Sequence, residues 1–218
     1  MWRNLPTLIG LEWRLEFRQR ASLAGVLLFA VGSVYVYSLA FGRLEPQLWN
    51  ALYWVILLFG ATNGLAGSYV RELQDRHLYY SQLTPPLPLF FAKLIVNACF
   101  LVALGLLVWG LLALLFGSPV RDILLFSGTL VLASTGLSVV LTFLALVAGR
   151  VRTGGGLVAV LAFPVVLPLL LTVIKLGAVS TRVITQLSTD RDLLVLVGIN
   201  LAAIGLSMLL VPLLWRDA

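Results

Sequence analysis

Six long stretches without a charged residue dominate this chain. They cover residues 21–42, 48–70, 94–120, 123–149, 153–174 and 193–215, and each holds at least 22 residues. A helix needs about 20 mostly apolar residues to cross about 30 Å of hydrocarbon. Because lipid offers the backbone no hydrogen-bond partners, we expect each stretch to be a helix.

Composition agrees with a membrane location. Hydrophobic residues make up 61% of the 218 residues and charged residues 11%, whereas a soluble domain has about 25% charged residues. The charges are too few to cover a surface in water. We predict one all-α integral membrane domain over residues 1–218, with spans near 21–42, 48–70, 94–116, 123–148, 155–175 and 193–214.

The basic residues suggest an orientation. With the N-terminus in the cytoplasm, ten Lys and Arg residues fall on the cytoplasmic side and five on the other. Positive charge accumulates on the cytoplasmic side of membrane proteins, so both termini are expected there. The net charge of +6 follows from this bias, and the absence of a basic face argues against nucleic acid. We expect the first span to stay uncleaved, because acidic residues precede a long apolar run.

Residues 1–20 are expected to form an interfacial helix, although residues 11–18 alternate apolar and polar like a strand. A lone strand at a membrane surface would leave its backbone unpaired. Wound as a helix, the segment has two apolar edges separated by glutamates on one side and arginines on the other, which suits the bilayer interface. The simpler interpretation is a basic anchor. The edges are Leu8, Leu11 and Leu15, and Trp13 and Phe17; the charged residues are Glu12, Glu16, Arg14 and Arg18.

The loop at residues 71–88 predicts a short amphipathic helix on the cytoplasmic side. Glu72 and Arg76 are four residues apart, in the order that favours a helix, and Pro85 and Pro86 would stop it. We expect this helix to dock a cytoplasmic partner; the alternative is a solvated loop. The candidate docking residues are Glu72, Leu73, Asp75, Arg76, His77 and Leu78.

Two features within the spans predict packing or movement. Gly60 and Gly64 have the GxxxG spacing that lets helices approach closely. Pro164 and Pro168 lie in the fifth span, where each removes a backbone donor and favours a kink. Together with Pro85 and Pro86, these prolines are candidate hinges. Ordinary packing and a static bend remain the alternatives.

Catalytic motifs are absent from the sequence. No predicted span has an ionisable residue at its centre, as ion-coupled carriers usually do, and His77 is the single histidine. The glycine-rich segment 149–156 lacks the lysine of a phosphate-binding loop. Cys99 is the single cysteine. We therefore expect no catalytic residues, no metal site and no enzyme activity; energy for transport would come from another subunit.

Several segments form a recognisable series along the chain. They are Leu11–Arg20, Trp54–Phe59, Arg71–Asp75, Leu83–Pro88, Ala92–Asn97 and the proline pair at 164 and 168. In this order they resemble the CcmB family, the haem exporter B permeases of cytochrome c maturation, and the resemblance covers essentially the whole chain.

This resemblance implies a permease of the ABC type-2 exporter layout in the bacterial inner membrane. A separate ATPase, CcmA, would dock on Arg71–Tyr80 as the coupling helix, and CcmC and CcmD would complete the complex. That complex passes haem to the periplasmic chaperone CcmE and drives its ATP-dependent release. Because no His, Met or Tyr pair is placed as axial ligands, haem is expected as cargo of the complex and not as a cofactor held by this chain.

Two other functions fit the same topology. One is an ABC permease for another cargo, such as a lipid or drug; the Leu83–Pro88 and Ala92–Asn97 matches and the partner proteins distinguish it. The other is a membrane scaffold without transport, which predicts no nucleotide-dependent movement of the fifth span relative to the second.

Overall fold

The computed structural model describes the backbone of residues 5–18, 20–83, 86–150, 155–183 and 189–216. Within these ranges it describes the side chains except at 20–21, 66–83, 86, 148–150, 155–163 and 214–216. The described residues form seven α-helices and no strand. They are α1 (Leu5–Arg18), α2 (Arg20–Ala40), α3 (Pro46–Leu83), α4 (Pro86–Phe116), α5 (Ile123–Arg150), α6 (Gly155–Ser180) and α7 (Thr189–Arg216).

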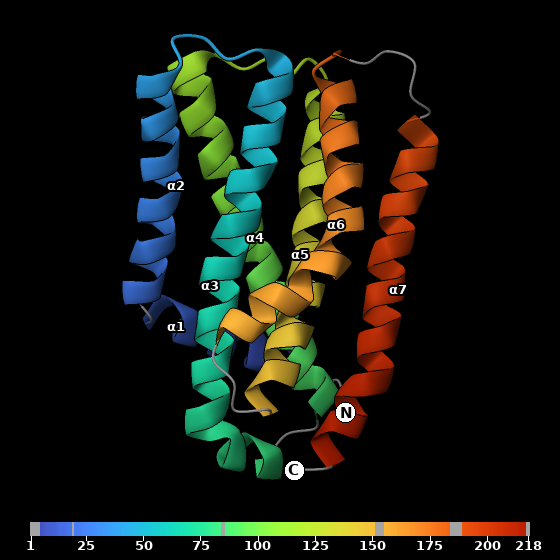
Figure 1. Ribbon diagram of the computed structural model, residues 1–218. Coiled ribbons are helices and arrows are strands. Elements are labelled where there is room, and N and C mark those ends of the chain that lie inside the picture. The colour runs from blue at the N-terminus through green and yellow to red at the C-terminus, as the bar shows by residue number, and fades with distance from the viewer. Residues whose placement is uncertain (1–4, 19, 84–85, 151–154, 184–188, 217–218) are drawn as a thin grey trace.

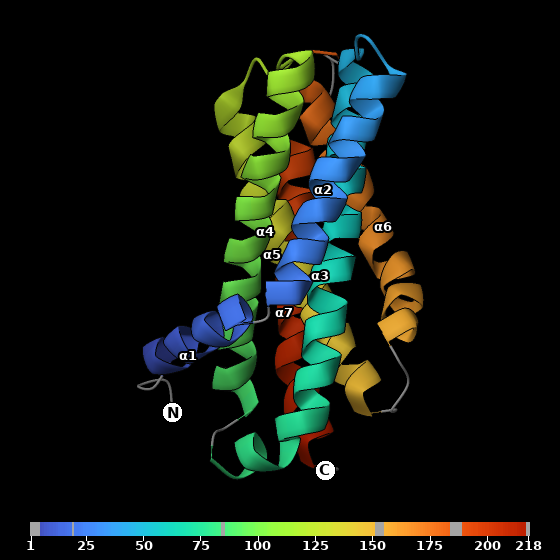
Figure 2. The same ribbon diagram turned by 90° about the vertical axis from the view of Figure 1, so that its left-hand side faces the viewer.

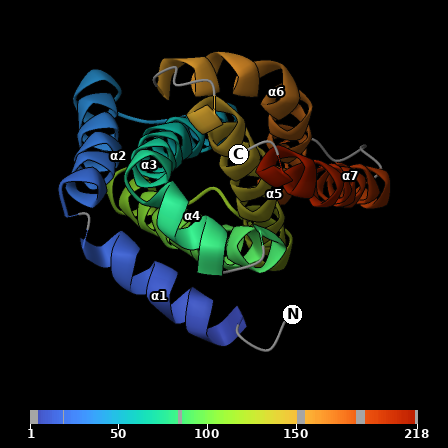
Figure 3. The same ribbon diagram turned by 90° about the horizontal axis from the view of Figure 1, so that it is seen from below.

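Helices α2 to α7 run along one axis as a bundle (Figure 1). The N-terminal helix α1 instead lies crosswise at one end, against α4 (Figures 2 and 3). The C-terminal end of α7 lies at that same end of the bundle (Figure 1). The chain is thus an all-α membrane protein whose first helix lies outside the bundle axis.

In the described part of the chain, five helices contain a segment long and apolar enough to cross a membrane. Among the described residues, α6 contributes a shorter apolar segment, Pro164–Ser180. The whole of α6 has 26 residues and is about 39 Å long at about 1.5 Å per residue, which is long enough to cross a membrane. A sixth crossing at α6 and the side of the membrane on which the termini lie remain predictions. The five segments are Ser22–Ala40, Pro46–Leu65, Leu87–Phe116, Ile123–Val147 and Thr189–Leu213.

Helix α5 forms the centre of the bundle. Of its membrane segment, 72% is buried inside the protein, against 17% for α2 and 22% for α7. It contacts α3, α4, α6 and α7, whereas large apolar side chains of α2 and α7 such as Leu28 and Leu209 remain exposed. In a membrane these exposed side chains face lipid, since hydrocarbon imposes no cost on apolar surface.

The helices around residues 71–88 are longer than the sequence pattern indicates. The expected short helix is continuous with the second span, because α3 runs unbroken from Pro46 to Leu83 and contains no proline after its first residue. In Figures 1 and 2 its last turns curve across the end of the bundle. Pro86 begins α4, a position where its missing N–H costs little. The helix that contains the third span, predicted from residue 94, therefore begins before that span.

Helix α6 changes direction along its length. In Figure 1 its N-terminal part runs obliquely to its C-terminal part. Pro164 and Pro168 both lie inside this helix and remove the hydrogen bonds that would hold it straight. The Thr172 hydroxyl donates to the Pro168 carbonyl over 2.8 Å, a side-chain bond that often accompanies helix bending.

Candidate coupling site

A buried ion cluster joins the crosswise helix α1 to the bundle. The Lys93 ammonium of α4 lies 3.1 Å from a carboxylate oxygen of Glu12 and 3.5 Å from one of Glu16. The three residues are only 1%, 3% and 5% exposed. Glu12 and Glu16 are one helical turn apart, so both carboxylates face the same lysine.

Apolar contacts extend this joint. Leu8 of α1 packs with Leu89 and Ala92 of α4 in a small cluster of buried side chains. Lys93 lies within the apolar segment Leu87–Phe116 and close to its start. The sequence pattern placed this lysine in a cytoplasmic loop; the structure places it inside α4, where paired carboxylates offset the cost of burying its charge.

Hydrogen bonds continue from α4 to α5 just beyond the ion cluster. The Ser138 hydroxyl donates to the Leu94 carbonyl over 2.8 Å, and the Asn97 amide donates to the Thr142 hydroxyl over 2.9 Å. Asn97 follows Lys93 by one helical turn, so the α1 contact and the α5 contact lie next to each other on α4. The hydroxyls at 138 and 142 therefore serve helix packing, as expected for small polar residues in spans.

Helix α5 also bonds to α7. The Thr135 hydroxyl donates to Asn200 Oδ1 over 3.2 Å. At Gly136 an added Cβ would lie 3.0 Å from that same oxygen and would collide with Leu169 of α6. Helices α5, α6 and α7 thus meet closely at this level of the bundle.

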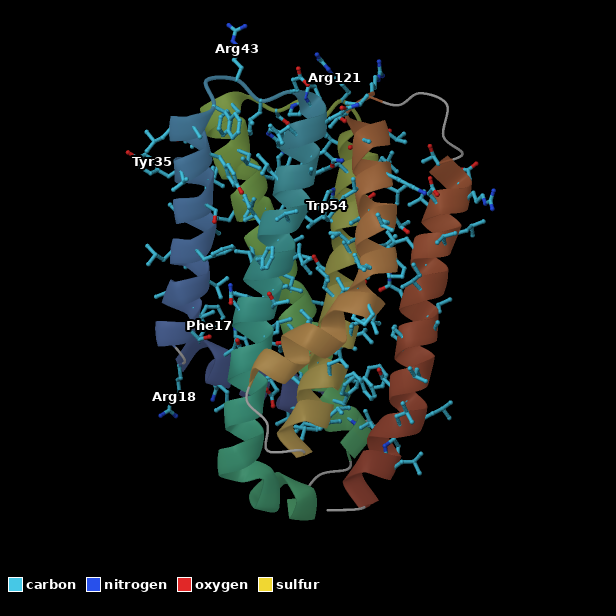
Figure 4. The ribbon with its side chains drawn as sticks, in the orientation of Figure 1. Phe17, Arg18, Tyr35, Arg43, Trp54 and Arg121 are labelled. Carbon is cyan, nitrogen blue, oxygen red and sulfur yellow. The ribbon has the colours of Figure 1, made fainter. Side chains whose placement is uncertain are left out.

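The other half of the bundle is held by a polar contact between α3 and α6. Asn50 Nδ2 donates to the Ile174 carbonyl over 2.8 Å, and the Trp54 indole N–H donates to Asn50 Oδ1 over 2.9 Å. Gly177 leaves room for both side chains: an added Cβ would collide with Asn50 Oδ1 and lie 2.8 Å from Trp54 Nε1. Figure 4 shows Trp54 inside the bundle.

Aromatic rings surround this contact. The Tyr53 ring packs against those of Trp54 and Phe126 at centroid distances of 4.9 and 5.0 Å and stacks on that of Trp49 at 5.6 Å. The Tyr53 hydroxyl also donates to the Gly105 carbonyl of α4 over 3.2 Å. Because these rings are buried against one another, they stabilise the meeting of α3, α4 and α5.

Gly60 and Gly64 lie on the side of α3 that contacts α2 and α4. A Cβ at Gly60 would come within 2.8 Å of Leu104, and one at Gly64 within 3.1 Å of Val26 and 3.3 Å of Phe100. Neither position has room for a larger side chain without movement of a neighbour.

The expected docking residues share one helix. Residues 71–78 all lie in the C-terminal part of α3, and their side chains lie outside the described part of the structure. Pro85 is also outside the described residues, and Pro86 is the first residue of α4. Among the described residues no three His, Cys, Asp or Glu side chains gather to hold a metal ion.

A known protein family matches almost the whole of this chain. The family model described as CcmB protein matches residues 3–213. The chain belongs to the CcmB family. It is also 31% identical over 169 residues to Heme exporter protein B of Pseudomonas aeruginosa, an alignment that covers 75% of this chain and 76% of the relative.

In this CcmB-family chain, sequence reasoning missed the partners of Lys93. Glu12 and Glu16 were expected to separate two apolar edges of a surface helix, yet they point into the protein. Two carboxylates one turn apart could have suggested a buried cation. No local sequence pattern, however, identifies Lys93 as that cation, since it lies 77 residues after Glu16.

Proposed function

We propose that this chain is the membrane permease subunit of a haem exporter in the bacterial inner membrane. The CcmB-family match over residues 3–213 carries the proposal. The Pseudomonas aeruginosa relative named Heme exporter protein B and the all-α membrane architecture support it. The chain itself would be no enzyme, and a separate CcmA-like ATPase would supply the energy.

The continuous helix α3 supports this form of coupling. The charge-free stretch of the second span ends at Val70, and the same helix continues from Arg71 to Leu83. Those 13 further residues add about 20 Å of helix at about 1.5 Å per residue, enough to leave the membrane. In our proposal the segment from Arg71 to Tyr80 contacts the ATPase, and its mixed charges fix the docking register.

Movement of that segment would pass to the bundle through α4. Helix α4 begins at Pro86, three residues after α3 ends. Its first turns bear Lys93, Leu94 and Asn97, which bind α1 and α5. We propose that α1, the start of α4 and α5 respond to ATP as one unit, with the bend of α6 as the hinge.

Haem would be the cargo of the assembled complex. CcmC-like and CcmD-like membrane subunits would hold or position it, and a CcmE-like periplasmic chaperone would receive it.

Affinity purification of the tagged chain in mild detergent, followed by mass spectrometry, tests the proposal. A haem-exporter ATPase together with a haem-handling membrane protein is the expected result. An unrelated ATPase alone would indicate a permease for another cargo, such as a lipid or drug. Recovery of the chain without any ATPase would support a scaffold instead.

A further inference from the structure

The charges of α1 are sorted between its two faces. The helix has two glutamates and two arginines, so its sequence is electrically balanced. Glu12 and Glu16 are buried, whereas Arg14 and Arg18 are exposed. The outward face of α1 therefore bears positive charge only.

Lys93 explains this sorting. Its ammonium lies within 3.5 Å of both carboxylates and holds the acidic side of α1 against α4. Each arginine follows a glutamate by two residues, which is about 200° around a helix, so Arg14 and Arg18 point away from the bundle. Figure 4 shows Arg18 pointing away from the bundle.

Two aromatic side chains share the outward side. Trp13 is 45% exposed and Phe17 is 57% exposed, and their rings lie 5.3 Å apart. Exposure of these two rings to water would be energetically unfavourable. At a bilayer surface, tryptophan and other amphipathic or apolar rings are favoured beside arginine and lysine.

The chain connection sets the depth of this face. Helix α1 ends at Arg18, α2 begins at Arg20, and the first membrane segment starts at Ser22. The end of α1 is thus within a few residues of the hydrocarbon boundary. Because α1 lies crosswise to the bundle (Figures 2 and 3), its outward residues run along the membrane surface.

We propose that the outward face of α1 binds anionic phospholipid headgroups. Arg14 and Arg18 contact the phosphates, and Trp13 and Phe17 insert their rings at the level of the headgroups. The exposed aromatic pair favours lipid over an acidic protein surface. The proposal does not depend on haem transport, since it uses only α1, Lys93 and the start of the first span.

A fluorescence-quenching experiment on the full-length chain tests this proposal. Gly10 is exposed, and a Cβ there meets nothing within 4 Å, so Gly10→Cys in a Cys99→Ser background accepts an environment-sensitive dye. The chain is placed in phosphatidylcholine nanodiscs containing a small, equal fraction of spin-labelled phosphatidylglycerol or spin-labelled phosphatidylcholine. Stronger quenching by the anionic label is expected, weakening at high salt.

The matched variants are Arg14→Gln with Arg18→Gln, and Arg43→Gln at the other end of the bundle (Figure 4). Each arginine near an anionic surface strengthens attraction severalfold, so the double variant is expected to lose the preference by roughly tenfold or more. Arg43→Gln should keep it. Equal quenching by both lipids in the parent chain overturns the proposal.

The same dye-labelled chain, purified in complex with its partners, tests whether another protein covers the outward face of α1 in place of lipid. If neither spin-labelled lipid quenches the dye in the assembled complex, protein covers α1 and the lipid proposal is wrong. Preferential quenching by the anionic lipid there supports it.

Discussion

At the scale of single residues, three buried charges stabilise the position of α1. The Lys93 ammonium and the carboxylates of Glu12 and Glu16 are almost completely removed from solvent. Removing charges from water is costly, and their attraction repays the cost only while the partners stay together. The cluster should therefore respond more strongly to loss of the shared lysine than to loss of one carboxylate.

Lys93→Met is expected to lower the stability of the protein by about 3–5 kcal/mol, because it leaves two buried carboxylates without this ammonium. Glu16→Gln should cost less, since Glu12 still pairs with the lysine. Thermal unfolding in detergent measures both. Lys175→Met, at an exposed position of α6, is the control and should change stability by less than about 0.5 kcal/mol. Equal midpoints for Lys93→Met and the control would show that the cluster contributes nothing.

Gly177→Ala is expected to destabilise the chain by about 1–3 kcal/mol through overpacking. The new methyl group would collide with Asn50 Oδ1 and break its contact with Trp54. The same thermal measurement applies. Gly198→Ala on α7, where a Cβ meets nothing within 4 Å, should be neutral or stabilising. An unchanged midpoint for Gly177→Ala would mean that α3 and α6 can separate at no cost.

At the scale of the helices, the charge-free stretches locate most elements well because a span must be apolar over its whole length. Their ends are less predictable. A charge criterion starts the third span only after Lys93, at residue 94, whereas α4 begins at Pro86. Lys93 is tolerated there because Glu12 and Glu16 neutralise its charge. These carboxylates lie on α1, which is far from α4 in the sequence, and a local sequence pattern cannot predict such a tertiary contact.

The candidate site shows the same limit. The amphipathic spacing of Glu72 and Arg76 predicts a helix, and α3 includes both residues. The sequence pattern did not predict that this helix is continuous with the second span, because a run of charged residues is typical of a loop between spans. Whether those charges bind a partner stays a prediction.

Glu72→Arg with Asp75→Arg is expected to abolish recovery of the ATPase with the tagged chain while leaving the chain in the membrane. Truncating a paired interfacial charge costs about 2–5 kcal/mol, and reversal should cost at least as much. Arg43→Glu, at the other end of the bundle (Figure 4), should leave recovery unchanged. Normal ATPase recovery with the double variant would remove α3 from the docking surface.

Pro168→Ala is expected to leave α6 as stable as before or more stable, since alanine restores a backbone donor and avoids the cost of proline in a helix interior. Cytochrome c maturation should fall nevertheless, if the bend is a hinge. Pro212→Ala, inside α7, is the control. Holocytochrome c is measured at equal amounts of membrane protein. Full maturation with Pro168→Ala would assign the bend to static shape.

At the scale of the whole molecule, polar contacts join helices in both halves of the bundle. Asn50, Trp54 and Gly177 join α3 to α6 in one half, and Lys93, Glu12 and Glu16 join α1 to α4 near the end where α3 curves. A protein built this way can transmit movement from that end while the aromatic half keeps its packing. We propose that transmission of this kind serves haem export.

Deletion of the gene for this chain in its host, followed by haem staining of c-type cytochromes, tests that central claim most directly. Loss of covalently bound haem, restored by the wild-type chain and not by Glu72→Arg with Asp75→Arg, is the predicted result. Normal holocytochrome c in the deletion strain would contradict a role in haem export for cytochrome c maturation.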